Sequence, residues 1–270
     1  MQVIGLCRFS YPALGGFQVE HESIEQREAF LYAPERLEER FRFFECFTLP
    51  CLKAQIEPDF TFLIVVGESL PGEARARLEA LVADVPQVVI QAHPPGPHRE
   101  VMKEAINSVK AQGREPCLQF RLDDDDAVAA SFVGRLRQTA ERVAGLMEDH
   151  RHIGIDFPRG YIARPHGGGI DATAIHQPFW TAGLALMFRA GVNVTVMNFA
   201  HQRVGRKMPS LSIPEEDMRL RGHNDYNDSR QGPGVKPVTL KRLDAAGEER
   251  FRMLYGIDAD HVREVFGASV

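Results

Sequence analysis

The chain has 270 residues, a formal net charge of −5 and a hydrophobic share of 44%. These are the proportions of a globular protein with a packed core, so intrinsic disorder is excluded. The slightly acidic balance argues against nonspecific binding to nucleic acid or to an anionic membrane. Four acidic residues stand side by side at positions 123–126. A functional account of the chain has to explain this cluster.

The cysteines and the N-terminal segment indicate a cytoplasmic protein. Cys7, Cys46, Cys51 and Cys117 show no CxxC spacing and lie in apolar stretches, which predicts reduced core thiols rather than disulfides or a zinc site. The N-terminal run is short and lacks a basic region, so it is typical of a first strand rather than a signal peptide. No stretch approaches the roughly 20 apolar residues of a membrane span, and no transmembrane segment is expected.

The first half of the chain alternates predicted strands with predicted helices. The expected strands are Val3–Phe9, Phe60–Val66, Gln87–Ala92 and Cys117–Leu122, and the expected helices are Pro34–Phe47, one that begins at Pro71, Arg99–Gln112 and Val128–Met147. Pro50 is expected to bend or end the first helix, and Gly113 to cap the third. Repeated strand–helix units predict an α/β fold, with a mostly parallel sheet flanked by helices.

The second half is richer in short strands. The candidates are Ile153–Phe157, Tyr161–Arg164, Ala172–Gln177, Leu184–Phe188 and Met218–Arg221, with a short helical stretch at 198–204 and a helix-like stretch at 240–266. Residues 222–237 are rich in Gly, Asn, Asp and Pro, which predicts a loop able to close over a site. The chain has no repeat and no Gly/Ser linker. We therefore expect one domain over residues 1–270, with a β-rich extension behind an α/β half of residues 1–135.

The aspartate cluster directly follows a predicted strand. In an open parallel sheet, ligands bind outside the carboxyl ends of the strands. Adjacent carboxylates repel one another, and their oxygens favour Mg²⁺, Mn²⁺ or Ca²⁺ over zinc. If the backbone stays extended, Asp123 and Asp125 share one side and can converge on one ion. Asp126 is then placed to cap the following helix. The alternative is a solvated acidic turn that only caps the helix.

The stretch Glu104–Asp126 resembles the nucleotide-sugar half of GT-A glycosyltransferases, in which a helix, a turn and an apolar strand lead to a DxD motif. It departs from the common form at Ile106-Asn107, where an Arg-Asn pair is usual. Further matching segments are Arg8–Ser10, Gly16–Gln18, Arg40–Pro50, Arg121–Asp126 and Asn227–Ser229. Together they resemble the bacterial putative rhamnosyltransferase family, mainly over residues 1–135.

The resemblance implies a metal-dependent glycosyltransferase that moves a sugar, rhamnose by the family's label, from a nucleotide-sugar donor to a glycan or lipid-linked acceptor in polysaccharide biosynthesis. It implies Mn²⁺ or Mg²⁺ as cofactor, with Asp125 as the metal ligand and Asp123 as its catalytic partner. Asp124 is assigned to donor binding, and a shift of the motif by one residue would exchange its role with that of its neighbours. Many GT-A enzymes add a C-terminal histidine to the metal; His223 is the first candidate and His201 the second.

Other residues are candidates for substrate binding. Arg8 at the first strand end and Arg121 beside the aspartates are expected to bind the donor diphosphate. The single tryptophan, Trp180, is expected to stack on the acceptor sugar. The general base of an inverting transfer stays open among Asp171, Asp225 and the acidic run 215–217. Two alternatives also stay open: another Mg²⁺-dependent nucleotidyltransferase or phosphohydrolase, and a non-catalytic nucleotide-sugar or glycan-binding module.

Overall fold

A computed structural model describes residues 1–15, 21–223 and 238–268 of the chain. Most of the predicted closing loop 222–237 lies outside these residues. The same holds for the matching segments Gly16–Gln18 and Asn227–Ser229 and for the general-base candidate Asp225.

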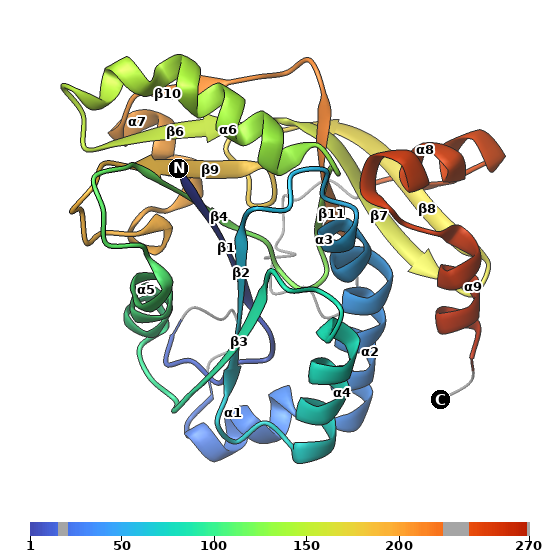
Figure 1. The fold of residues 1–270 in the computed structure, drawn as a ribbon. Coiled ribbons are helices and arrows are strands. Elements are labelled where there is room, and N and C mark those ends of the chain that lie inside the picture. Colours follow the sequence, from blue (N-terminus) through green and yellow to red (C-terminus); the bar gives the residue numbers. More distant parts are fainter. Residues whose placement is uncertain (16–20, 224–237, 269–270) are drawn as a thin grey trace.

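A seven-stranded sheet forms the centre of the molecule (Figure 1). Its strands in spatial order are β10 (Ser210–Ser212), β6 (His152–Asp156), β9 (Leu184–Phe188), β4 (Cys117–Arg121), β1 (Gln2–Arg8), β2 (Thr61–Gly67) and β3 (Val88–His93). The pairs β4–β1, β1–β2 and β2–β3 are parallel, and β9 runs antiparallel to β4 and β6. The predicted mostly parallel sheet is confirmed, and the carboxyl ends of β1 and β4 meet at one edge.

Helices cover both faces of this sheet (Figure 1). On one face lie α2 (Pro34–Phe43), α3 (Leu49–Lys53), α4 (Gly72–Val82) and α6 (Phe132–Val143), and on the other lies α5 (His98–Val109). The alternation along β1 shows why both faces need cover: Val3 and Cys7 belong to one buried cluster, whereas Ile4 and Leu6 belong to the other. All four cysteines are buried and free, as predicted.

A second, five-stranded sheet forms the predicted β-rich extension. Its strands in spatial order are β12 (Lys241–Arg242), β8 (Gly169–His176), β7 (Arg159–His166), β11 (Asp217–Gly222) and β5 (Ala127–Val128). β7 and β8 form a hairpin that pairs His166 with Gly169 across its turn. Because β5 directly follows the aspartates, the acidic cluster is the point where the chain passes from one sheet to the other.

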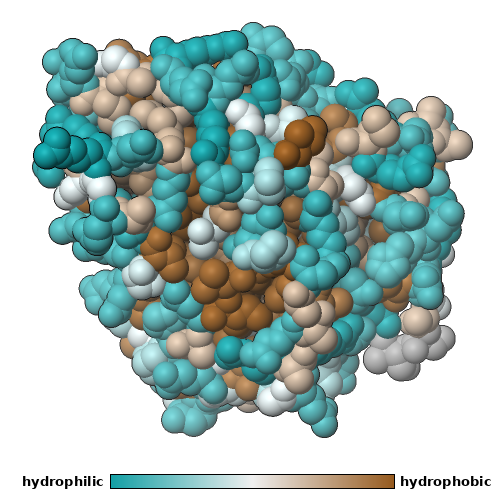
Figure 2. Space-filling model, in the orientation of Figure 1, coloured by the Kyte–Doolittle hydropathy of each residue, from teal (hydrophilic) through white to brown (hydrophobic). Residues whose placement is uncertain are grey.

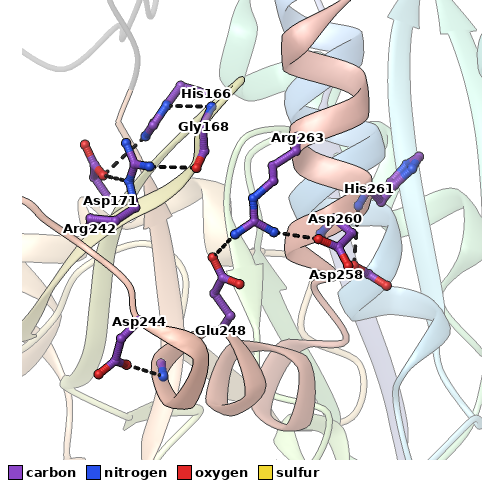
Figure 3. A network of polar contacts seen from close by, with 11 residues as sticks. His166, Gly168, Asp171, Arg242, Asp244, Glu248, Asp258, Asp260, His261 and Arg263 are labelled. Carbon is purple, nitrogen blue, oxygen red and sulfur yellow. Dashed lines mark hydrogen bonds and ion pairs between the residues drawn. The ribbon is translucent and has the colours of Figure 1, made fainter.

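The C-terminal helices α8 (Ala245–Tyr255) and α9 (Ala259–Gly267) pack against this second sheet. Figure 3 shows the polar contacts that surround them. Arg242 donates to the Asp171 carboxylate (2.7 Å) and to the Gly168 carbonyl (2.6 Å), which ties β12 to the hairpin. Arg263 of α9 pairs with Glu248 of α8. The Arg242 contacts thus hold β12 on the hairpin, and the Arg263–Glu248 pair holds the two helices together.

The remaining helices are short. They are α1 (Ile24–Leu31) and α7 (Val204–Lys207), with 3₁₀ turns η2 (Ala144–Met147), η3 (Val196–Asn198) and η4 (His201–Arg203). None of the described helices is long and apolar enough to cross a membrane. Hydrophilic side chains cover much of the face in Figure 2, with apolar atoms gathered near its centre. The most exposed large apolar side chains, Ile56 and Met253, come from different elements, as is ordinary for a protein surface.

Three predicted boundaries are wrong. Val128 lies in β5 rather than in a helix, and α6 begins at Phe132 after Ser131, so Asp126 does not cap it. α5 ends at Val109, where Lys110 turns extended, so Gly113 is not its cap. The stretch 240–266 holds two helices, since Gly256 ends α8 in the left-handed region.

The helix expected to bend or end at Pro50 instead continues through it. A π-helical turn, η1 (Phe44–Thr48), joins α2 to α3. Pro50 lies in the first turn of α3, where a missing N–H costs little. Arg40 and Thr48 are eight residues apart, which in a regular α-helix would rotate them about 80° from one another. The π turn accommodates about one extra residue and so brings both side chains to one face.

The end of α8 provides a test of the described backbone. Gly256 has φ +70°, and an added Cβ would lie 2.9 Å from the Pro50 carbonyl oxygen. We expect Gly256→Ala to lower the free energy of unfolding by about 1–3 kcal/mol in chemical denaturation, since it adds both strain and a collision. Gly145→Ala is the control, because nothing lies within 4 Å of its added Cβ. Equal stability of the two variants would contradict the described junction of α8 with α3.

Candidate functional site

The four aspartates form a tight turn between the two sheets. The Leu122 N–H donates to the Leu6 carbonyl (3.0 Å), and the Asp126 N–H then donates back to the Asp123 carbonyl (3.1 Å). The expected extended backbone is therefore wrong. The Asp123 side chain is 43% exposed, whereas that of Asp125 is 6% exposed. Strand alternation does not bring these two carboxylates to one side.

A buried arginine holds the centre of the turn. Arg40 on α2 donates through Nε to Asp124 Oδ2 (2.9 Å), and its Nη2 contacts Asp124 Oδ1. Its Nη1 donates to Asp125 Oδ2 (3.2 Å). This bidentate geometry is the strongest pairing available to a guanidinium and a carboxylate. From the same helix face, the Thr48 hydroxyl donates to the Asp126 carbonyl (2.8 Å). The helix α2–η1–α3 thus fixes the turn from beneath.

The end of β11 closes against the other side of the turn. The Gly222 N–H donates to Asp126 Oδ1 (3.1 Å). An added Cβ at Gly222 would lie only 2.1 Å from the Asp125 carbonyl oxygen, so the close approach requires glycine. Burial raises the pKa of Asp126 well above its usual value, and the nearby Asp125 carboxylate raises it further. Asp126 is thus a buried structural acceptor.

Three arginines gather around the exposed carboxylate of Asp123. Arg8 ends β1 and Arg121 ends β4, and the two strands are parallel neighbours. Arg121 Nη2 lies 3.9 Å from Asp123 Oδ1, and Arg221 approaches from β11. Desolvation raises the pKa of Asp123, but Arg121, Arg8, Arg221 and Arg40 outweigh it and hold the pKa below its usual value. We call Arg8, Arg121 and Arg221 the arginine cluster.

Two histidines border the arginine cluster. His98 begins α5, and burial together with Arg8 and Arg121 lowers its pKa to about 3. His201 lines a small cavity with Arg121, and burial followed by Arg121 and Arg221 lowers its pKa as well. Both rings are therefore neutral at pH 7, so they act as hydrogen-bonding groups rather than as cations.

The structure does not bring His223 together with Asp123 and Asp125 as a metal site. Its N–H donates to the Ala163 carbonyl (2.8 Å), and it lines a cavity of about 460 Å³ together with Glu35 and Glu39 of α2. Across residues 1–15, 21–223 and 238–268, no group of three or more His, Cys, Asp or Glu is placed to hold a metal ion. Burial, Arg121 and Arg221 lower the pKa of the second candidate, His201, overall, although Asp123 acts to raise it.

Trp180 lies beside the arginine cluster on a constrained loop. The ring centroid is 4.7 Å from the Arg221 guanidinium carbon and 5.4 Å from that of Arg219. Phe179 and Ala182, on either side, have φ values of +56°, a region that costs non-glycine residues energy. Trp180 thus lies beside the arginine cluster and contacts Arg221.

The buried groups around this loop explain how its strained backbone is held. The Phe179 N–H donates to Asp156 Oδ1 (3.0 Å). Buried Arg219 donates through Nη2 to the carbonyls of Pro158 (2.9 Å) and Gln177 (2.5 Å). Burial lowers the pKa of Arg219 to about 10, so it remains charged at pH 7. Asp156 and Arg219 therefore anchor the loop that presents Trp180.

Three of the described general-base candidates are held in ion pairs: Glu216 with Arg135 (2.5 Å), Asp217 and Asp171. Asp217 pairs with Arg159 (3.0 Å) and Arg250 (2.6 Å) at the start of β11. Five residues of extended strand, about 16 Å, separate it from Gly222 at the aspartate turn. The contact with Arg242 lowers the pKa of Asp171 (Figure 3). These carboxylates stabilise the second sheet, and the general base stays open.

Sequence reasoning missed Arg40, Arg221 and His98. Arg40 lay within a segment quoted for the family resemblance, but nothing local indicated that it would reach the aspartates. Arg221 directly precedes Gly222, at the end of a correctly predicted strand. His98 follows the proline-rich loop after β3, so the rule that ligands bind at the carboxyl ends of parallel strands could have indicated it.

Similarity to known proteins is found in one family model and in several solved structures. The model of the family described as "Putative rhamnosyl transferase" matches residues 2–236. Comparison with curated proteins gives no match. Residues 1–349 of TarS from S. aureus are 8% identical and match with a TM-score of 0.41; the match covers 82% of this chain and 60% of that one. The same fragment in complex with UDP gives 8% identity, a TM-score of 0.43 and coverage of 83% and 61%.

A third solved structure, a putative nucleotide-diphospho-sugar transferase from Desulfovibrio desulfuricans G20, is 12% identical with a TM-score of 0.36, and 83% of each chain is covered. This chain thus spans about 60% of the length of the TarS fragment. The family match and the mostly parallel sheet flanked by helices define a GT-A-type glycosyltransferase. Within that class, the chain belongs to the putative rhamnosyl transferase family.

The contact between Arg40 and the turn predicts a large loss of stability. Arg40→Met leaves Asp124 buried without its cation, so we expect a loss of about 3–5 kcal/mol in the free energy of unfolding measured in urea. Arg42→Met, two residues along α2, is the matched control: its Glu38 partner is more exposed, and a loss below about 1 kcal/mol is expected. Similar losses in both variants would contradict the structural role given to Arg40.

The lowered pKa of His98 predicts a dependence of stability on pH. Between about pH 6.5 and 3 the unfolded chain takes up a proton at this ring that the folded chain does not. Stability is therefore lost as the pH falls through that range. His98→Gln is expected to reduce the slope of unfolding free energy against pH in this range, relative to the natural protein. His150→Gln, at an exposed position, is the matched control. An unaltered slope in His98→Gln would show that His98 is not held neutral.

Proposed function

We propose that this protein transfers a sugar from a nucleotide-sugar donor to the hydroxyl of an acceptor at the edge where β1 and β4 end. The observation that carries the proposal is the arginine cluster around Asp123. A nucleotide sugar offers two linked phosphates, and guanidinium groups are the side chains best suited to bind them. The family match supports the same reaction class.

The reaction breaks the bond between the anomeric carbon of the donor and the oxygen of the outer phosphate. That oxygen keeps the electron pair and leaves as part of a nucleoside diphosphate. The acceptor oxygen forms the new bond to the anomeric carbon and releases its proton to a base or to water. Negative charge grows on the diphosphate during this step, so positive groups fixed beside it stabilise the transition state.

The finer assignments follow from the family name and from single side chains. Rhamnose is the sugar that the name suggests, with a glycan or lipid-linked molecule as acceptor. Trp180 contributes an aromatic face and an indole N–H beside Arg221, which suits the apolar face of a sugar ring. TarS was solved with UDP, so UDP is a natural first ligand to test here.

The predicted divalent cation fits the described residues poorly. Arg40 contacts the carboxylates of Asp124 and Asp125, and Asp126 accepts the Gly222 N–H. Asp123 is the exposed carboxylate of the turn, but arginines surround it, and they repel a cation. We therefore derive no step through a metal ion, and Mn²⁺ or Mg²⁺ as cofactor stays a prediction that the next experiment addresses.

A thermal-shift screen tests the proposed donor. Nucleoside diphosphates and nucleotide sugars are added with and without Mn²⁺, and nucleoside monophosphates serve as controls. The nucleotides that carry one particular base are expected to raise the melting temperature of the protein, since a ligand at about 100 times its Kd adds roughly 2.7 kcal/mol of stability. The monophosphate of that base is expected to act more weakly, because it offers the arginines one phosphate. Absence of any shift would contradict the proposal.

Product analysis then separates the open alternatives. A glycosyltransferase releases the nucleoside diphosphate from its nucleotide sugar when an acceptor is present. A nucleotidyltransferase or phosphohydrolase cleaves a phosphate bond instead, and a binding module releases nothing. Release of inorganic phosphate or of a nucleoside monophosphate would overturn the assignment to sugar transfer.

A further inference from the structure

We propose that Arg8, Arg121 and Arg221 supply the main charge that holds the nucleoside diphosphate, with Trp180 as the positioning residue for Arg221, so that the nucleotide binds without a divalent cation. This inference rests on the proposed function. In it, the three guanidinium groups bind the departing nucleoside diphosphate in place of the metal ion expected from the DxD motif.

The three arginines come from three separate strands that meet at one edge. Leu6 of β1 is in register with Arg121 of β4, and Arg8 lies two residues beyond Leu6 on the same face of the sheet. That face is the one covered by α5, whose first residue is His98. Arg221 reaches the same place from β11, which the Gly222 contact holds against the aspartate turn. The three arginine side chains therefore approach Asp123 from both sheets.

The local charge suits an anion rather than a cation. Arg40 is paired with Asp124 and Asp125 beneath the surface. Above them, the guanidinium groups of Arg8, Arg121 and Arg221 lie near Asp123, the exposed carboxylate of the turn. A diphosphate group brings about two negative charges to this place, and charge-assisted hydrogen bonds to guanidinium groups are short and strong. A divalent cation would instead have to approach three like charges.

The position of Trp180 assigns it a role beyond contact with the acceptor. Its ring lies 4.7 Å from the Arg221 guanidinium carbon, within the range of a cation–π contact. The loop that carries it is held by Asp156 and by the buried Arg219, although Phe179 and Ala182 have unfavourable positive φ angles. Because these contacts hold the loop despite its strained backbone, the Trp180 ring keeps one orientation. The ring in turn orients the Arg221 guanidinium.

Isothermal titration calorimetry with UDP, GDP and dTDP, in excess EDTA and in excess Mn²⁺, tests the charge assignment. The nucleotide that binds tightest is expected to keep its Kd within about threefold on chelation. Arg121→Met and Arg221→Met are each expected to weaken it about 10- to 100-fold, the range for a lost hydrogen bond to a charged group. Arg252→Met on α8, a largely exposed side chain, is the control that leaves binding unchanged.

A second series tests the positioning role of Trp180. Trp180→Leu is expected to lose as much affinity as Arg221→Met, and the double variant no more than either alone. Trp180→Phe is expected to restore most of the affinity, because it keeps an aromatic face beneath the guanidinium. Additive losses would overturn the positioning role. If Arg221→Met does not fold, Arg221→Lys replaces it. Lysine keeps the positive charge but cannot donate two parallel hydrogen bonds as a guanidinium does, so the nucleotide is still expected to bind more weakly.

The outcomes separate the inference from the proposed function. Strict dependence of wild-type binding on Mn²⁺, or wild-type affinity in the arginine variants, would overturn the inference and leave sugar transfer standing. No binding of any nucleotide with or without Mn²⁺ would overturn the proposed function, and the inference with it.

Discussion

The site depends on the buried ion pair between Arg40 and the aspartate turn. Both oxygens of Asp124 and one oxygen of Asp125 face a single guanidinium. This contact holds α2 under the junction of the two sheets, where β4 ends and β5 begins. Because β5 pairs with β11 and Gly222 closes on Asp126, the same contact also determines where Arg221 lies. Since a buried carboxylate without its partner is costly, the cluster is stable only when the helix and both sheets are assembled.

The acidic run that dominates the sequence is therefore largely neutralised by arginine. Arg40 pairs with Asp124 and Asp125 in the interior of the turn, the arginine cluster lies around Asp123, and burial favours the protonated form of Asp126. A net charge of −5 for the whole chain says little about this edge, which presents guanidinium groups and neutral histidines to a ligand. Under the proposed function, this surface binds the diphosphate of a nucleotide sugar.

Much of the fold could be predicted from sequence because its signals are local. Continuous apolar runs identified the parallel strands, and proline and glycine marked the breaks between elements. The errors arose where a distant contact decides the structure. The turn at 123–126 is held by Arg40, 84 residues away from Asp124, and the helix continues through Pro50 because a π turn precedes it. Arg221 joins the site only through sheet pairing, and no pattern in the nearby sequence marks it. For His98, its place after a predicted parallel strand was the one available signal.

A crystal structure with a bound nucleoside diphosphate tests the central claim most directly. The account predicts that the diphosphate oxygens lie within hydrogen-bonding distance of Arg8, Arg121 and Arg221, above the exposed carboxylate of Asp123. A diphosphate seated elsewhere, for example in the cavity lined by His223 and Glu39, would contradict it.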